Sequence, residues 1–211
     1  MSYKKINTSG QITAVITEEI NINDLPTIAK SIMVRDPLIE QVGYLQNTRF
    51  TMMGGELSIN GLIAGAYVIG QSGKINNFSF TLKEENLTLT LPRTLVIDIQ
   101  QDIVCLKGIT YQVIQGFPLD KVITKNQIDR LKILSQNTQA SGFIYHENDQ
   151  IMPLIYVPAT SSYVWENACG SGSLAFSLIT GNQIVIQPSG DRIKFKLLSD
   201  TITVMETVKE I

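Results

Sequence analysis

Residues that bind metals or form disulfides are scarce in this chain. Its 211 residues include one histidine and two cysteines, too few for a disulfide framework or for a His/Cys metal cluster. Charge is scarce as well, because Asp, Glu, Lys and Arg make up 17% of the chain and the net charge is -2. No basic stretch marks a surface for nucleic acid or anionic lipid. We therefore expect a small-molecule partner, with no nucleic acid, no membrane and no metal.

Long apolar runs are also missing. No segment approaches the roughly 20 apolar residues of a membrane span, and polar residues follow Met1–Lys5, where a signal peptide would have an apolar core. Neither a phosphate-binding Gly-x-x-x-x-Gly-Lys loop nor a dinucleotide fingerprint is present, so no cofactor is predicted. The sequence predicts a cytoplasmic protein with reduced cysteines and leaves monomer and homodimer open.

The segment Glu166–Ser173 places Cys169 directly before small residues and the apolar run Leu174–Ile179. That run is typical of a helix with the cysteine at its N-terminus. Free backbone N–H groups and the helix dipole at such a terminus stabilise a thiolate and can bind a carboxylate. A thiol there can have its pKa lowered from about 8.5 to roughly 3.5–7.5. A buried structural cysteine beside a glycine-rich turn is the alternative interpretation.

A second segment, Met53–Tyr67, has the same layout. An acidic residue, a small nucleophilic side chain and glycine precede a helix of small apolar residues, with Ser58 in the position of Cys169 and Gly61 in that of Gly172. Positional identities are few, so the repeat alone is weak evidence. Two helix N-termini, each with an O–H or S–H group, are what is needed to flank one substrate carbon from both faces.

Strand patterns dominate the rest of the chain, with β-branched and aromatic residues at period two and breaks at Gly, Asn, Asp or Pro. Gly116–Pro118 interrupts this pattern before a charged helix. We therefore divide the chain into an N-terminal half, 1–115, with 201–211 as a candidate addition, and a C-terminal half, 116–200. Helices are predicted over 24–33, 58–69, 125–136 and from Cys169 to Gly181. Strands are predicted over 3–7, 12–17, 41–46, 49–53, 75–82, 87–91, 94–100, 103–107, 110–115, 142–146, 151–157, 162–165, 183–187, 193–198 and 202–205.

Three segments, 7–15, 54–60 and 165–172, resemble the diaminopimelate epimerase-like superfamily. Within it, the chain is similar to the small amino-acid racemases related to the histidine racemases of opine metallophore pathways. The family pattern in the second segment is roughly Gly-Gly-Glu-x-Cys-Gly-Asn, so this chain departs from it with Ser58 for cysteine and Ile59 for glycine. Gln11 also stands where the family usually has asparagine. Only the third segment, Trp165-Glu-Asn-Ala-Cys-Gly-Ser-Gly172, is intact.

The resemblance implies an α+β fold of two pseudo-symmetric β-rich halves. Each half is a mostly antiparallel sheet wrapped around a central helix, the active site lies in the cleft between the halves, and the final strand crosses back to the first half. It also implies a cofactor-independent (PLP-independent) amino-acid racemase or epimerase. Its acid–base pair would be Cys169 and Ser58, acting on the α-carbon of a small amino acid, with histidine and diaminopimelate both open.

The resemblance assigns substrate binding to the same helix N-termini. Backbone amides around Ile59, Asn60, Gly170 and Ser171 would hold the substrate carboxylate. The Asn60 and Gln11 side chains are candidates for the carboxylate or amine, and Glu166 for the ammonium group. Structural alternatives stay open for three of these residues: Glu166 as a helix cap, Asn60 as a turn residue and Gln11 as a solvated strand residue.

Ser58 is the main difficulty for this mechanism. A serine hydroxyl is a poor base unless a neighbour activates it, and the only histidine, His146, lies in a polar segment typical of a surface turn. Three accounts stay open: a working proton donor in an enzyme of asymmetric activity, an amino-acid-binding relative that has lost racemisation, and a deliberate Cys→Ser replacement. A dehydratase, in which the thiol takes a proton and Ser58 assists a leaving hydroxyl, is a further alternative.

Overall fold

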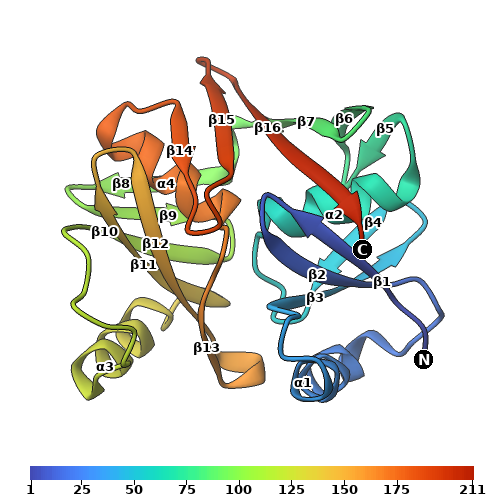
Figure 1. Cartoon of the computed structure of the whole chain (residues 1–211), viewed down its shortest axis with the longest axis horizontal. Coiled ribbons are helices and arrows are strands. Elements are labelled where there is room, and N and C mark those ends of the chain that lie inside the picture. The colour runs from blue at the N-terminus through green and yellow to red at the C-terminus, as the bar shows by residue number, and fades with distance from the viewer.

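The computed structural model describes all 211 residues, and the chain forms two similar halves (Figure 1). The first half, on the right of Figure 1, contains a helix, α2, surrounded by strands, and a second helix, α1, below them. Its elements are β1 (Lys4–Thr8), β2 (Gln11–Ile16), the 3-10 turn η1 (Ile22–Asp24), α1 (Leu25–Arg35), β3 (Gln41–Gln46), β4 (Arg49–Met52), α2 (Ile59–Ile69), β5 (Ser72–Ile75), β6 (Phe78–Lys83) and β7 (Asn86–Pro92).

The second half repeats this order around α4, with α3 in the place of α1 (Figure 1). At matching places in the two halves two strands are parallel neighbours, β2 with β3 and β10 with β11, whereas the strand pairs on either side of them are antiparallel. Its elements are the 3-10 turn η2 (Arg93–Leu95), β8 (Val96–Gln100), β9 (Ile103–Leu106), β10 (Ile109–Gln115), α3 (Lys125–Leu134), β11 (Ala140–Glu147), β12 (Gln150–Val157), η3 (Pro158–Thr160), β13 (Ser162–Trp165), α4 (Gly170–Thr180), β14 (Ile184–Ile186), β15 (Arg192–Leu197) and β16 (Thr201–Glu210).

The last strand of each half crosses into the other half. β16 pairs with β15 and β7 along its first part and then with β1, where Glu210 lies opposite Ile6. β7 pairs with β6 and β16, and the chain continues through η2 into β8, which pairs with β9 of the second half. The two crossing strands, β7 and β16, thus pair with each other and join the halves into one continuous sheet.

The strand pairing does not favour the sequence-based boundary at residue 116. β10 lies immediately before that boundary and is the parallel neighbour of β11, from Ile109 opposite Ala140 to Gln115 opposite His146. Residues 96–115 therefore belong to the sheet of the second half. We propose that the halves divide at η2, and that Gly116–Pro118 begins a loop inside the second half.

The two central helices are buried on every side, which small side chains permit. Residues 59–66 of α2 are all buried, as expected for a helix that is apolar all round. A Cβ at Gly61 or Gly65 would lie only 3.0 or 2.7 Å from the ring of Phe50 on β4, so glycine at these positions lets the helix lie against the sheet. Residues 170–177 of α4 are buried in the same way.

Most predicted strands match the structure to within two residues, and two differ more. The range predicted as one strand over 75–82 contains the end of β5, a turn and most of β6, because Asn76 and Asn77 both have positive φ, 48° and 69°, and form a two-residue turn. The strand predicted over 202–205 extends to Glu210, since its second part pairs with β1.

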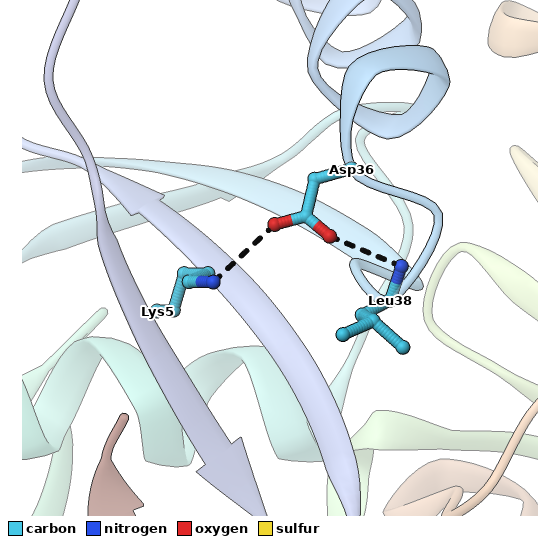
Figure 2. Close-up of polar contacts among 3 residues, drawn as sticks. All are labelled: Lys5, Asp36 and Leu38. Carbon is cyan, nitrogen blue, oxygen red and sulfur yellow. Dashed lines mark hydrogen bonds and ion pairs between the residues drawn. The ribbon is translucent and has the colours of Figure 1, made fainter.

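The turn after α1 is fixed to the first strand through Asp36. The Lys5 ammonium on β1 lies 3.3 Å from one carboxylate oxygen of Asp36, and the amide of Leu38 donates to the other at 3.2 Å (Figure 2). Both charged side chains are partly exposed, so the ion pair contributes about 0–1 kcal/mol. The Lys5–Asp36 contact matters for the position of the chain, because this turn leads directly into Glu40 and Gln41.

None of the helices is both long and apolar enough to cross a membrane.

Candidate active site

A narrow cavity lies where the N-termini of α2 and α4 meet between the two halves, with an empty volume of about 430 Å³ including its open mouth. Its lining combines both helix N-termini with residues from the sheets of both halves. The lining residues are Gln11, Glu40, Gln41, Met53, Glu56, Leu57, Ser58, Asn60, Ile109, Tyr111, Ile155, Val157, Val164, Glu166, Cys169, Gly170 and Ser171.

Ser58 and Cys169 occupy the same position on the two helices. Each has extended backbone and is the N-cap residue, and each side chain accepts an amide hydrogen from the third residue of its helix. The Ser58 Oγ to Gly61 N distance is 3.0 Å, and the Cys169 Sγ to Gly172 N distance is 3.3 Å. Because both caps line one cavity, the structure brings together the two residues that the sequence places 111 positions apart.

Side chains from each helix N-terminus bind the amides of the other. Ser171 Oγ accepts the amide hydrogen of Ile59 at 3.0 Å, and Asn60 Oδ1 accepts that of Gly170. The Asn60 Nδ2 donates to the carbonyl of Thr8 at 3.2 Å, so both polar atoms of this side chain are used within the protein.

Two amides are left for a ligand, those of Asn60 and Ser171. Each belongs to the second residue of its helix, where no intrahelical acceptor exists, and neither makes a hydrogen bond within the protein. Of the four amides expected to hold a carboxylate, those of Ile59 and Gly170 already donate within the protein. The Ile59 side chain packs in the core rather than lining the cavity.

A chain of glutamine side chains fixes the Ser58 hydroxyl. Ser58 donates to Gln41 Oε1 at 2.9 Å. The amide nitrogen of Gln41 donates to Gln11 Oε1 at 2.9 Å and to Thr13 Oγ1 at 2.7 Å. With both hydrogens of that nitrogen bound, the oxygen of Gln41 faces Ser58. Gln11 is thus 1% exposed and part of the cavity wall, which rules out the solvated alternative.

Cys169 is held from three directions. Its amide donates to Gln187 Oε1 at 2.9 Å, and the Tyr111 hydroxyl lies 3.7 Å from its sulfur. Burial raises the pKa of the thiol well above its usual range, and the nearby Glu166 carboxyl raises it further. The Gly172 amide and the Tyr111 hydroxyl lower the pKa by less. The expectation of a lowered pKa is therefore wrong for the unliganded site, because burial and a like charge outweigh the helix N-terminus.

Three carboxyl groups line the same cavity, and burial is the main cause of a raised pKa in each. The pKa is raised to about 7 in Glu40 and in Glu56, and to about 8 in Glu166. Glu40 accepts both the amide and the side-chain N–H of Asn167, at 2.8 and 2.7 Å. The Glu40 and Glu56 carboxyls both add to the shift of Glu166. Glu166 does not cap α4, since Cys169 has that position.

The single histidine lies elsewhere. His146 is near the end of β11, where its ring packs 5.0 Å from that of Phe176, centroid to centroid. It is not a surface-turn residue, and burial lowers its pKa. It does not line the cavity. No three His, Cys, Asp or Glu side chains converge closely enough to hold a metal ion.

Sequence reasoning missed Glu40, Gln41 and Tyr111. Glu40 directly precedes β3, Gln41 is the first residue of β3, and Tyr111 is on β10; neither strand carries a glycine-rich motif. Only the sheet register, which places Gln41 opposite Thr13, brings Gln41 to the cleft. Glu56 had a local signal, because it occupies the acidic position of the Met53–Tyr67 segment.

The sequence is similar to those of histidine racemases. A family model described as "Histidine racemase CntK N-terminal domain" matches residues 90–191, which include Cys169. The chain is 26% identical to a histidine racemase of Fusobacterium nucleatum subsp. nucleatum, over 83% of this chain and 78% of that protein. It is 21% identical to a histidine racemase of Staphylococcus aureus, over 87% of this chain and 81% of that protein.

Solved structures match the fold across nearly the whole chain. A predicted epimerase from Pseudomonas aeruginosa superposes with a TM-score of 0.62 at 9% identity, covering 99% of this chain and 96% of that one. A probable proline racemase from Agrobacterium radiobacter gives 0.59 at 11% identity, covering 99% and 90%. The α+β fold with two β-rich halves is therefore confirmed. In sequence the chain is histidine racemase-like, and in structure it has the diaminopimelate epimerase-like fold.

Proposed function

We propose that this protein is an amino-acid racemase that works without pyridoxal phosphate, with Cys169 as its essential acid–base group. The observation that carries the proposal is the pair of helix N-termini, capped by Cys169 and Ser58, that face one cavity. Racemisation needs a group on each face of the α-carbon, one to remove a proton and one to supply it. The similarity to histidine racemases supports the same reaction class.

The free amides of Asn60 and Ser171 would bind the substrate carboxylate. Two helix dipoles point their positive ends at this place. When the α-proton leaves, negative charge moves from the α-carbon onto the carboxylate oxygens, and fixed N–H donors stabilise that charge more than they stabilise the ground state. The two helix N-termini therefore serve both binding and catalysis.

The charge of the cavity favours a substrate with a cationic side chain. Three carboxyl groups, Glu40, Glu56 and Glu166, line the cavity, and no Lys, Arg or His does. The α-ammonium group would neutralise one carboxylate, and a protonated imidazole a second. Diaminopimelate would bring a second carboxylate with no basic partner among the lining residues. We therefore propose histidine as the substrate.

Ser58 would stand on the face of the α-carbon opposite Cys169. A hydroxyl is a weaker acid than a thiol, so Ser58 acting alone would make this side of the reaction the slow one. An amino-acid-binding protein with impaired two-base chemistry is the competing function, because the Ser58 hydrogen is already donated to Gln41.

The test is exchange of the α-hydrogen with D2O, followed by proton NMR on L- and D-histidine and then on other free amino acids. Exchange that disappears in Cys169→Ala, with an unchanged circular dichroism spectrum, is the expected result. Calorimetric binding of an amino acid with no exchange at either face would instead favour the binding protein. Formation of a keto acid would favour a dehydratase.

The reduced thiol that this chemistry needs fits a cytoplasmic location, which we propose as well.

A further inference from the structure

Ser58 cannot take up a proton in the hydrogen-bond arrangement of the structure. Its hydrogen is donated to Gln41 Oε1 at 2.9 Å, and its oxygen accepts the Gly61 amide hydrogen at 3.0 Å. A hydroxyl acts as a base only when a neighbouring base removes its proton. The amide oxygen of Gln41 is not basic, and the other polar atom of Gln41 is held by Gln11 and Thr13. Another group must therefore exchange the proton on this side.

Five ionisable side chains line the cavity, and four of them are committed elsewhere. Tyr111 and Glu166 lie on the Cys169 side, where both affect the pKa of the thiol. Both oxygens of Glu40 accept hydrogen bonds from Asn167. The fifth side chain is that of Glu56.

Glu56 has the placement that the role requires. It lies two residues before Ser58 on the segment that leads into α2, and both residues line the cavity. Its Oε2 accepts the Gly54 amide hydrogen at 2.9 Å, which fixes the carboxyl group. The residue is 8% exposed, so it is not fully enclosed by the protein.

We propose that Glu56 is the acid–base group on the Ser58 side of the cleft, opposite Cys169. This inference rests on the proposed racemase function. For one enantiomer, the Glu56 carboxylate takes the α-proton: the Cα–H bond breaks, an O–H bond forms, and the electron pair moves onto the substrate carboxylate. The Cys169 thiol then gives its proton to the opposite face and becomes a thiolate. The other enantiomer reacts by the reverse transfers.

Two further features fit this role. Burial raises the pKa of Glu56 to about 7, and a group with a pKa near the working pH is effective both as acid and as base. Ser58 then keeps a structural role as the N-cap of α2.

The test compares Glu56→Gln with Glu40→Gln, which removes the same charge from the same cavity. In D2O, Glu56→Gln should exchange the α-hydrogen of only one histidine enantiomer, with retention of configuration, because Cys169 still works on its own face. Exchange of the other enantiomer should fall about 100-fold or more. Glu40→Gln should change the exchange rates of the two enantiomers by the same factor. In the Glu56→Gln background, Ser58→Cys should restore inversion, since a thiol can exchange the proton itself.

The role of Glu56 would be overturned if Glu56→Gln slowed α-hydrogen exchange equally for both enantiomers. It would also be overturned if this variant racemised as fast as the unmodified protein. These outcomes are distinct from failure of the proposed function, in which the unmodified protein exchanges no amino acid at all.

Discussion

Ser171 Oγ, on α4, accepts the amide hydrogen of Ile59 at the start of α2, with an N···O distance of 3.0 Å. The same hydroxyl donates to the carbonyl of Leu57 at 3.1 Å. One side chain therefore joins the N-termini of the two central helices, and both of its partners are backbone groups of the other half. This contact connects the two helix N-termini at the cavity.

Ser171→Ala should lower the free energy of unfolding by about 1–3 kcal/mol, because it leaves the buried amide of Ile59 and the partly buried carbonyl of Leu57 without the Ser171 hydroxyl. Urea denaturation followed by circular dichroism measures the change. Ser177→Ala is the matched control: this serine is on the same helix, 1% exposed, and its hydroxyl has no hydrogen-bond partner. Removing the Ser177 hydroxyl should leave the free energy of unfolding unchanged or raise it. A similar loss of stability in both variants would contradict the role given to Ser171.

Ser58→Cys should raise the rate of histidine racemisation about tenfold or more, because it adds a thiol that can exchange the proton itself on the side where only Glu56 does so in the unmodified protein. Polarimetry from each enantiomer gives the rate. The double variant with Cys169→Ala is the control, and it should remain inactive. A Ser58→Cys protein that folds but racemises no faster would show that proton transfer on this side does not limit the reaction.

Much of the fold could be predicted because its signals are local. Glycine-rich segments before apolar runs predicted both central helices and their caps, and these caps do line one cavity. The half boundary could not be predicted in the same way. Strand signals with only short breaks run through 86–115, and nothing local marks the boundary that we propose between β7 and β8.

The candidate site was predictable only where its residues lie near the motifs. Gln41 reaches the cleft through the parallel register of β3 against β2, and Tyr111 through β10. No sequence spacing encodes such contacts. The pKa of Cys169 was also beyond reach, because it depends on burial and on the distance to Glu166 rather than on the helix N-terminus alone.

Stability should fall as the pH rises from about 5 to 9, and Glu206 on β16 should contribute to this. It is 2% exposed, and burial raises its pKa to about 8, which the nearby Ser9 offsets only in part. In the unfolded chain a glutamate has a pKa of about 4.3. The folded protein therefore holds the Glu206 proton more tightly than the unfolded chain does. At low pH this difference adds on the order of 3–5 kcal/mol to the free energy of unfolding, and the added stability is lost as the pH rises through the folded pKa.

Glu206→Gln should therefore flatten the dependence of the melting temperature on pH, as calorimetric scans at several pH values would measure. Glu210→Gln, on the same strand, is the control: Glu210 is exposed and pairs with Lys4 at 3.0 Å. That variant should keep the slope of the unmodified protein. A slope that is unchanged in Glu206→Gln would exclude ionisation of this residue as a cause.

Tyr111→Phe and Glu166→Gln should move the pKa of Cys169 in opposite directions. Burial is the main cause of the raised pKa of Cys169. The Tyr111 hydroxyl, 3.7 Å from the sulfur, lowers this pKa, and the Glu166 carboxyl raises it. Loss of the hydroxyl removes a donor that stabilises the thiolate, whereas loss of the carboxylate removes a like charge. Iodoacetamide alkylation against pH, with Cys105 replaced by Ser, gives the midpoint. It should rise in Tyr111→Phe and fall in Glu166→Gln, and shifts of the same sign would mean that packing, rather than charge and hydrogen bonding, sets the reactivity of the thiol.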